Sequence, residues 1–182
     1  MAQVVALLRS INVGGRRLKM DHLRAIAADA GCTGVSTLVA TGNIVMDEPA
    51  DLAATGASLQ AELARQYGET AVVMRTHDDL VDAVAANPLA AAVEAGELAG
   101  NRVHTMFLFA APSSAAVQRG HDEQPDGHEQ FEVVGAHLLG LYPDGMARTT
   151  LTASWLKRRL GTGTMHNHNT VQKVVAATTP SD

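Results

Sequence analysis

The sequence has few aromatic residues and a single cysteine. Phe, Trp and Tyr make up 3% of its 182 residues, so aliphatic side chains must fill the core, and a base-stacking surface for nucleic acid is disfavoured. Cys32 alone cannot form an internal disulfide and fits a reducing compartment. No apolar run approaches the roughly 20 residues of a membrane-spanning helix. We therefore expect a cytoplasmic protein that does not enter a membrane.

Positive charge is also scarce. The formal net charge is −5, and 46% of the residues are hydrophobic, which is enough for a sizeable core. Nucleic-acid-binding domains usually carry a basic balance or a basic stripe, whereas the cations here cluster only at 16–19 and 157–159. Nucleic acid is therefore a disfavoured partner, while a small anion held by a few cations fits the composition.

The hydrophobic pattern predicts an α+β protein made of two ferredoxin-like halves and an extra C-terminal helix. Strand and helix periodicity in the first half predicts the order β-α-β-β-α-β, with elements at 4–10, 20–31, 35–47 (a hairpin), 50–68 and 70–76. The second half predicts the same order without its last strand, at 102–110, 113–122, 130–135, 136–142 and 150–161. The terminal helix is expected at 170–179.

The same pattern predicts the domain organisation. Residues 1–78 are expected to form the N-terminal subdomain, and 101–182 the C-terminal subdomain with the terminal helix. Between them, 79–100 is expected to hold a short helix, ended by Asn87-Pro88, and a linker.

A first candidate ligand site follows the first strand. In a β-α-β-β-α-β unit the end of strand one and the hairpin turn lie at the same end of the sheet. Glycine amides and a helix start attract anions there, although glycines that serve only the turn are the simpler alternative. The candidate residues are Arg9, Asn12, Gly14, Gly15, Lys19, Thr41, Gly42 and Asn43.

A second candidate site is the polar segment GTGTMHNHNTVQK, at 161–173. Asn169 followed by Gln172 is typical of a capping box, and the helix start with Asn167, Thr170 and Lys173 suits an anion or a polar ligand. His166 and His168 are expected in extended chain, where both would point to one side as a metal pair does. Two ligands are too few for a zinc site, so we expect neither metal nor cofactor.

Other reactive residues fit structural roles. Cys32 follows a helix end and is expected to pack in the core. Five carboxylates cluster around a turn and are expected to be solvated: Asp122, Glu123, Asp126, Glu129 and Glu132.

Three segments, LLRSINVGG, VATGNIVM and TMHNHNTVQK, together resemble the Domain-of-Unknown-Function-1697 family of bacterial proteins. The resemblance covers nearly the whole chain and implies two ferredoxin-like halves, with no assigned reaction. The residues that match the family motifs are Arg9, Asn12, Val13, Gly14, Gly15, Gly42, Asn43, Thr164, Asn167, Asn169, Thr170 and Lys173.

The chain departs from the family pattern at several of these sites. Ser10 stands where Gly is usual, Thr41 where Ser is usual, and Thr149-Thr150 where a Ser-Lys pair is frequent. His166 replaces a usual Arg and His168 a usual Trp. These changes remove up to two cations and a stacking aromatic, so an inherited anion site is expected to be weaker or to depend on pH through the imidazoles.

The leading hypothesis is binding, or turnover, of a small anionic ligand in a cleft between the two halves. A phosphorylated metabolite or a nucleotide has the required chemistry. One alternative is a non-catalytic interaction module, such as a homodimer. Another is a metal-dependent hydrolase that uses His166 and His168. The sequence does not decide whether the protein is an enzyme.

Overall fold

A computed structural model describes residues 2–9, 18–38, 42–68 and 70–180 of the chain. Its contacts divide the chain into two compact units, Met1–Val81 with Lys173–Asp182, and Asp82–Gln172. The divisions fall within two helices, α3 (His77–Ala85) and α7 (His168–Thr178). Each unit combines a four-stranded antiparallel sheet with helices, which confirms the predicted α+β class.

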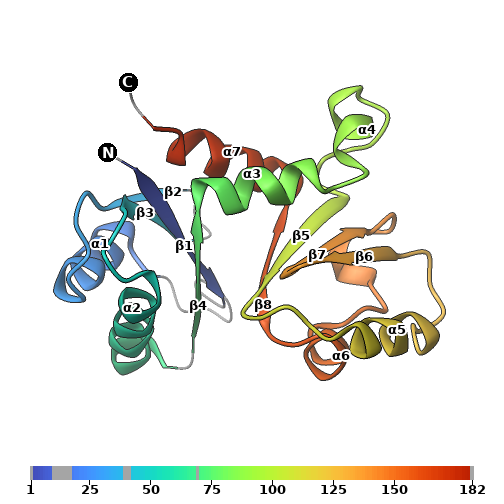
Figure 1. Ribbon diagram of the computed structural model, residues 1–182, viewed down its shortest axis with the longest axis horizontal. Helices are drawn as coiled ribbons and strands as arrows, with labels where there is room; N and C mark the ends of the chain where they lie inside the picture. The colour runs from blue at the N-terminus through green and yellow to red at the C-terminus, as the bar shows by residue number, and fades with distance from the viewer. Residues whose placement is uncertain (1, 10–17, 39–41, 69, 181–182) are drawn as a thin grey trace. The chain divides into compact units, whose positions relative to one another are not determined.

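The first unit has the predicted β-α-β-β-α-β order (Figure 1). Its elements are β1 (Gln3–Arg9), α1 (Met20–Asp29), β2 (Ser36–Leu38), β3 (Asn43–Asp47), α2 (Leu52–Tyr67) and β4 (Ala71–Thr76). The strands lie in the order β2-β3-β1-β4, and every neighbouring pair is antiparallel. This is the ferredoxin-like arrangement, with β1 at the centre.

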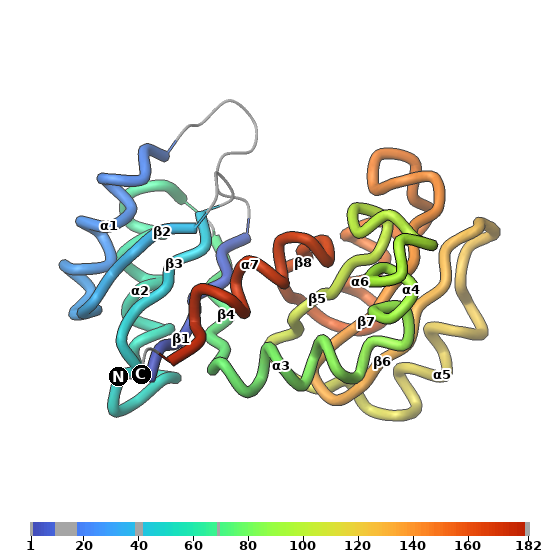
Figure 2. Tube along the Cα trace, turned by 90° about the horizontal axis from the view of Figure 1, so that it is seen from above, coloured from blue at the N-terminus to red at the C-terminus, as the bar shows by residue number. Residues whose placement is uncertain are grey.

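Helices α1 and α2 lie side by side along one face of this sheet (Figure 1, Figure 2). Leu23, Ile26 and Ala27 recur at helical spacing on α1 and join the core, as the sequence predicted. Within α2, a Cβ on Gly56 would stand 2.7 Å from Cγ of Met74. The glycine that interrupts this helix pattern therefore serves close packing against β4.

The second unit repeats this architecture. Its elements are α4 (Ala90–Glu94), β5 (Val103–Leu108), α5 (Ser114–Asp122), β6 (Gln130–Val134), β7 (His137–Leu141), the 3₁₀ helix η1 (Met146–Arg148), α6 (Ala153–Arg159) and β8 (Gly163–Asn167). The strand order β6-β7-β5-β8 matches that of the first sheet. Helix α4, which the sequence pattern did not predict, lies between 88 and 100.

The prediction that the second half lacks its last strand is wrong. β8 pairs antiparallel with β5, from Leu108 opposite Gly163 to His104 opposite Asn167. Polar side chains, Thr164 and His166 among them, interrupt the apolar alternation by which a strand is usually recognised. This strand forms because it pairs with β5, which is distant in the sequence.

The start of α7 also differs from the prediction. The capping side chain is Asn167, whose Oδ1 accepts a hydrogen bond of 2.9 Å from the Thr170 amide. Asn169 is therefore not the N-cap, and His168 is already the first helical residue. The expectation that His166 and His168 share one extended segment is wrong, because β8 ends at Asn167.

We predict that Asn167→Ala lowers the free energy of unfolding by about 1 kcal/mol, since it removes the partner of the Thr170 amide. Urea unfolding measures this loss, and hydrogen exchange should become faster at the Thr170 amide. Gln172→Ala is the matched control and should leave that exchange rate unchanged. Faster exchange in Gln172→Ala alone would contradict the assignment of the cap.

Candidate functional site

Arg9, Gly42 and Asn43 lie at the same end of the first sheet. Arg9 is the last residue of β1, and Asn43 is the first residue of the antiparallel β3. Gly42 precedes Asn43 with φ of 83°, a backbone conformation that favours glycine. The register of β1 and β3 thus places one cation and one amide at the same end of the sheet, as the sequence predicted.

The side chains of Arg9 and Asn43 share one face of the sheet. Val4, Ala6, Leu8 and Ile44 pack in the core with the helices. Because side chains alternate along a strand, Arg9 and Asn43 belong to the face turned away from α1 and α2. The Asn43 side chain is fully buried, and Arg9 is half-buried. This is the environment in which a guanidinium bonds strongly to an anion.

Helix α1 begins at this same end. Lys19 is its exposed N-cap residue, and no side chain caps the helix there. In the first turn, Nδ1 of His22 lies 2.6 Å from the hydroxyl of Tyr67 at the end of α2. The segment after α2 returns to β1, where the Thr70 hydroxyl donates to the Arg9 carbonyl over 2.7 Å. The His22–Tyr67 pair was missed, since 45 residues separate its members.

Four residues of the first candidate site lie outside the part of the chain that the structure describes. They are Asn12, Gly14, Gly15 and Thr41. Their role as ligand-binding residues stays a prediction.

The second candidate group surrounds the start of α7. The His168 amide donates to the Gly100 carbonyl over 3.2 Å, and the Thr170 amide donates to Asn167. Two of the four N–H groups that a helix start offers to an anion thus have protein partners. A Cβ on Gly100 would stand 2.1 Å from Oδ1 of Asn169, so this side chain lies against the glycine. Lys173 is exposed one turn further along.

Thr164 and His166 face away from the helices of the second unit. Met106 and Leu108 of β5 join the core with Trp155 and Leu156 of α6. The intervening β5 residues, Thr105 and Phe107, pair with His166 and Thr164 and belong to the opposite face. Thr164 is 1% exposed and His166 is 7% exposed. Both polar side chains are therefore buried in the protein.

Burial keeps the imidazole of His166 neutral. Desolvation, together with the nearby His104, lowers the pKa of His166 to about 4. At neutral pH this residue therefore supplies no positive charge to the second candidate group. Among the residues that the structure describes, no group of three or more His, Cys, Asp or Glu side chains could hold a metal ion.

Glu129 is the exception among the five carboxylates expected to be solvated, since Asp122, Glu123, Asp126 and Glu132 are exposed. The residue is 8% exposed, and its carboxylate accepts hydrogen bonds from the amide and the hydroxyl of Thr150, at 2.8 and 3.1 Å. Burial alone would raise the pKa of Glu129, but hydrogen bonds from Thr149 and Thr150 outweigh it and lower the pKa. Its partner lies 21 residues away, so this structural contact has no local sequence signal.

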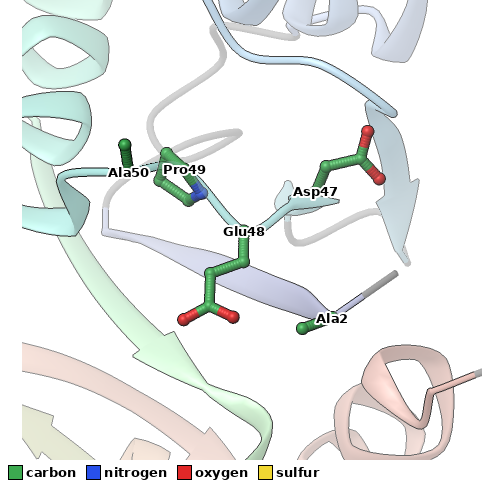
Figure 3. A pocket seen from close by; sticks show the side chains of 5 residues that line it. All are labelled: Ala2, Asp47, Glu48, Pro49 and Ala50. Carbon is green, nitrogen blue, oxygen red and sulfur yellow. The ribbon is translucent and has the colours of Figure 1, made fainter.

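A cavity of about 510 Å³ opens at the other end of the first sheet (Figure 3). It is lined by Ala2, Asp47, Glu48, Pro49 and Ala50. The carboxylates of Asp47 and Glu48 point away from one another (Figure 3). They therefore do not converge on a common ligand, and their negative charge opposes an anion.

Comparisons with known proteins agree with this architecture. A family described as "Protein of unknown function (DUF1697)" matches residues 1–138. The structure of a conserved bacterial protein from Streptococcus pneumoniae is similar, with a TM-score of 0.73, 17% sequence identity and 99% of each chain covered. At this identity the likeness shows the fold alone. No curated protein matches the chain. Over the described residues, no helix has the length and apolar character needed to span a membrane.

We predict that acid destabilises the protein through His166. Between pH 6.5 and pH 4, His166 is protonated in the unfolded chain but stays neutral in the folded chain. The free energy of unfolding therefore has its full value above pH 6.5 and falls as the pH approaches 4. The loss corresponds to about 3 kcal/mol at roughly 1.4 kcal/mol per unit of pKa. Urea unfolding at pH 7 and pH 4.5 measures it.

His166→Gln should show a smaller loss than the wild type, because the amide does not titrate. His128→Gln is the control, since Asp144 raises the pKa of the exposed His128, which is the opposite direction. An equal loss in wild type and His166→Gln would contradict the assignment to His166.

Proposed function

We propose that this chain, which belongs to the DUF1697 family of proteins of unknown function, binds a small anionic ligand. Membership of this family does not itself assign an activity. The site is the end of the first sheet where β1 stops and β3 starts. A phosphorylated metabolite or a nucleotide has the required chemistry. A shared cleft between the two halves stays a prediction.

The main support for this proposal is the burial of Arg9 and its lack of an ion pair with the described carboxylates. Arg9 is half-buried at the end of β1, and none of the described carboxylates forms an ion pair with it. A guanidinium presents several donors in a planar fork that suits phosphate oxygens. In a chain with a net charge of −5, a cation that no carboxylate of the described residues neutralises is suited to an external anion.

The neighbouring groups complement this cation. The buried amide of Asn43 occupies the same end and face of the sheet. Lys19 adds a second cation at the start of α1, where the helix dipole also favours negative charge. We assign Arg9 to charge neutralisation, Asn43 to orientation of the ligand, and Lys19 to long-range attraction.

We predict that inorganic phosphate, pyrophosphate or AMP raises the melting temperature of the wild-type protein. Arg9→Ala should weaken the binding of whichever probe binds most tightly by about tenfold or more, because a hydrogen bond to a charged group contributes about 1.5–3 kcal/mol. Thermal shift identifies the ligand, and calorimetry gives the dissociation constant.

Arg9→Lys should retain part of the affinity, since it keeps the charge and loses the planar fork. Arg119→Ala removes an exposed cation of the second unit and should bind as the wild type does. The proposal fails if none of the three probes stabilises the protein, or if Arg9→Ala and Arg119→Ala bind equally well.

A second candidate function is a non-catalytic interaction module that forms a homodimer. Phe109 and Val134 are large apolar side chains that are 48% and 47% exposed, and such side chains indicate an interaction surface where they adjoin one another. The Leu108 amide donates to the Ala136 carbonyl over 2.9 Å, so the end of β5 lies beside the turn after β6. The two apolar side chains therefore lie at the same end of the second sheet.

If this end mediates self-association, light scattering should give twice the monomer mass for the wild type and the monomer mass for Phe109→Ser. Met146→Ser is the control, because Met146 is also exposed, at 40%, but lies in η1. A wild-type protein that stays monomeric well above micromolar concentration would contradict the dimer.

A further inference from the structure

Strand β8 carries two buried polar atoms that no residue in the described part of the chain satisfies. Oγ1 of Thr164 and Nε2 of His166 have no hydrogen-bond partner among the described residues. The residues are 1% and 7% exposed, so bulk solvent does not satisfy these atoms either. More than nine in ten buried polar groups in native proteins have a partner, which makes two neighbouring exceptions informative.

The two atoms belong to a single surface. Thr164 and His166 are separated by two positions on β8 and therefore project from the same face, about 6.6 Å apart along the strand. Across the pair of strands, Phe107 lies opposite Thr164 and Thr105 lies opposite His166. The ring centroids of Phe107 and His166 are 6.4 Å apart. A group placed between Thr164 and His166 would have an apolar wall at Phe107.

The chemistry of the surface favours an uncharged partner. The imidazole of His166 is neutral at physiological pH, because burial and His104 lower its pKa to about 4. An ion brought to this buried position would lose its hydration without meeting an opposite charge, which is strongly unfavourable. A hydroxyl both donates and accepts hydrogen bonds, and it can match either role of a threonine hydroxyl and an imidazole nitrogen.

We propose that Thr164 and His166 form a binding site for one uncharged hydroxyl group. Its source is either an ordered water molecule or the hydroxyl of a small ligand such as a polyol. The bound group bridges Oγ1 of Thr164 and Nε2 of His166 and satisfies both. This site takes a neutral group, draws both of its hydrogen-bonding groups from β8 and does not depend on the anion site at Arg9.

Nuclear magnetic resonance on the whole chain tests the source of the hydroxyl. A long-lived bound water gives a cross-peak between the water resonance and the His166 ring protons. A ligand hydroxyl instead gives a shift of the His166 ring nitrogens when glycerol or ribose is added. We expect one of these two signals in the wild type and neither in Thr164→Val.

Thermal unfolding of Thr164→Val provides the second measurement. If the Thr164 hydroxyl has a bound partner, the substitution should lower the melting temperature by roughly 2–4 °C. Thr178→Val is the matched control, since Thr178 is fully buried and its hydroxyl donates to the Val174 and Val175 carbonyls. The melting temperature of Thr178→Val should fall by an amount similar to that of Thr164→Val.

Three results would overturn the proposal. The first is the absence of both signals in the wild type, and the second is a signal that persists in Thr164→Val. The third is a melting temperature of Thr164→Val that equals or exceeds that of the wild type, because removal of an unpaired buried hydroxyl is not destabilising. Arg9→Ala should retain the His166 signal, which separates this test from that of the anion site.

Discussion

The antiparallel pairing of each central strand with its two neighbours is the constraint on which the rest of the structure depends. β1 lies between β3 and β4, and β5 lies between β7 and β8. Residues on both faces of these central strands are buried, such as Val4 and Val5 on β1. A slip of one residue would exchange the two faces and place side chains of the wrong size and polarity in each close-packed layer, so packing specifies the register. That register then determines which polar side chains meet.

The strand register also determines which polar side chains lie on the face of each sheet that is turned away from its helices, and these side chains differ between the two units. In each unit one face of the sheet packs against its two helices with mostly apolar side chains. The other face carries the polar candidates, which are Arg9 and Asn43 in the first unit and Thr164 and His166 in the second. The first pair offers a charge and the second offers only neutral groups. The two surfaces therefore suit different ligand chemistries.

Several elements could be predicted from local sequence because their signals are local. The apolar run of β1 and the helical spacing of Leu23, Ile26 and Ala27 on α1 each reflect a single element with one buried face. The position of Arg9 and Asn43 at the same end of the sheet follows from the order of the elements and the handedness of the crossover. Their position at one end of the first sheet was thus predictable from the sequence.

What escaped prediction depends on partners distant along the chain. β8 lacks the pattern of a strand and forms because β5 offers it an edge. The cap at Asn167 belongs to a helix that starts where β8 ends, two residues before the Asn169 of the sequence motif. Glu129 became a buried hydrogen-bond acceptor through Thr150, and not a solvated acid.

By itself, the sequence determined the α+β class, the order of most elements and the chemical types at the first strand end, because hydrophobic periodicity and turn chemistry act over a few residues. Only the tertiary structure decided which face each polar side chain occupies and how far water is excluded from it. Those two properties make His166 a neutral hydrogen-bonding group, since charge states depend on burial and neighbours.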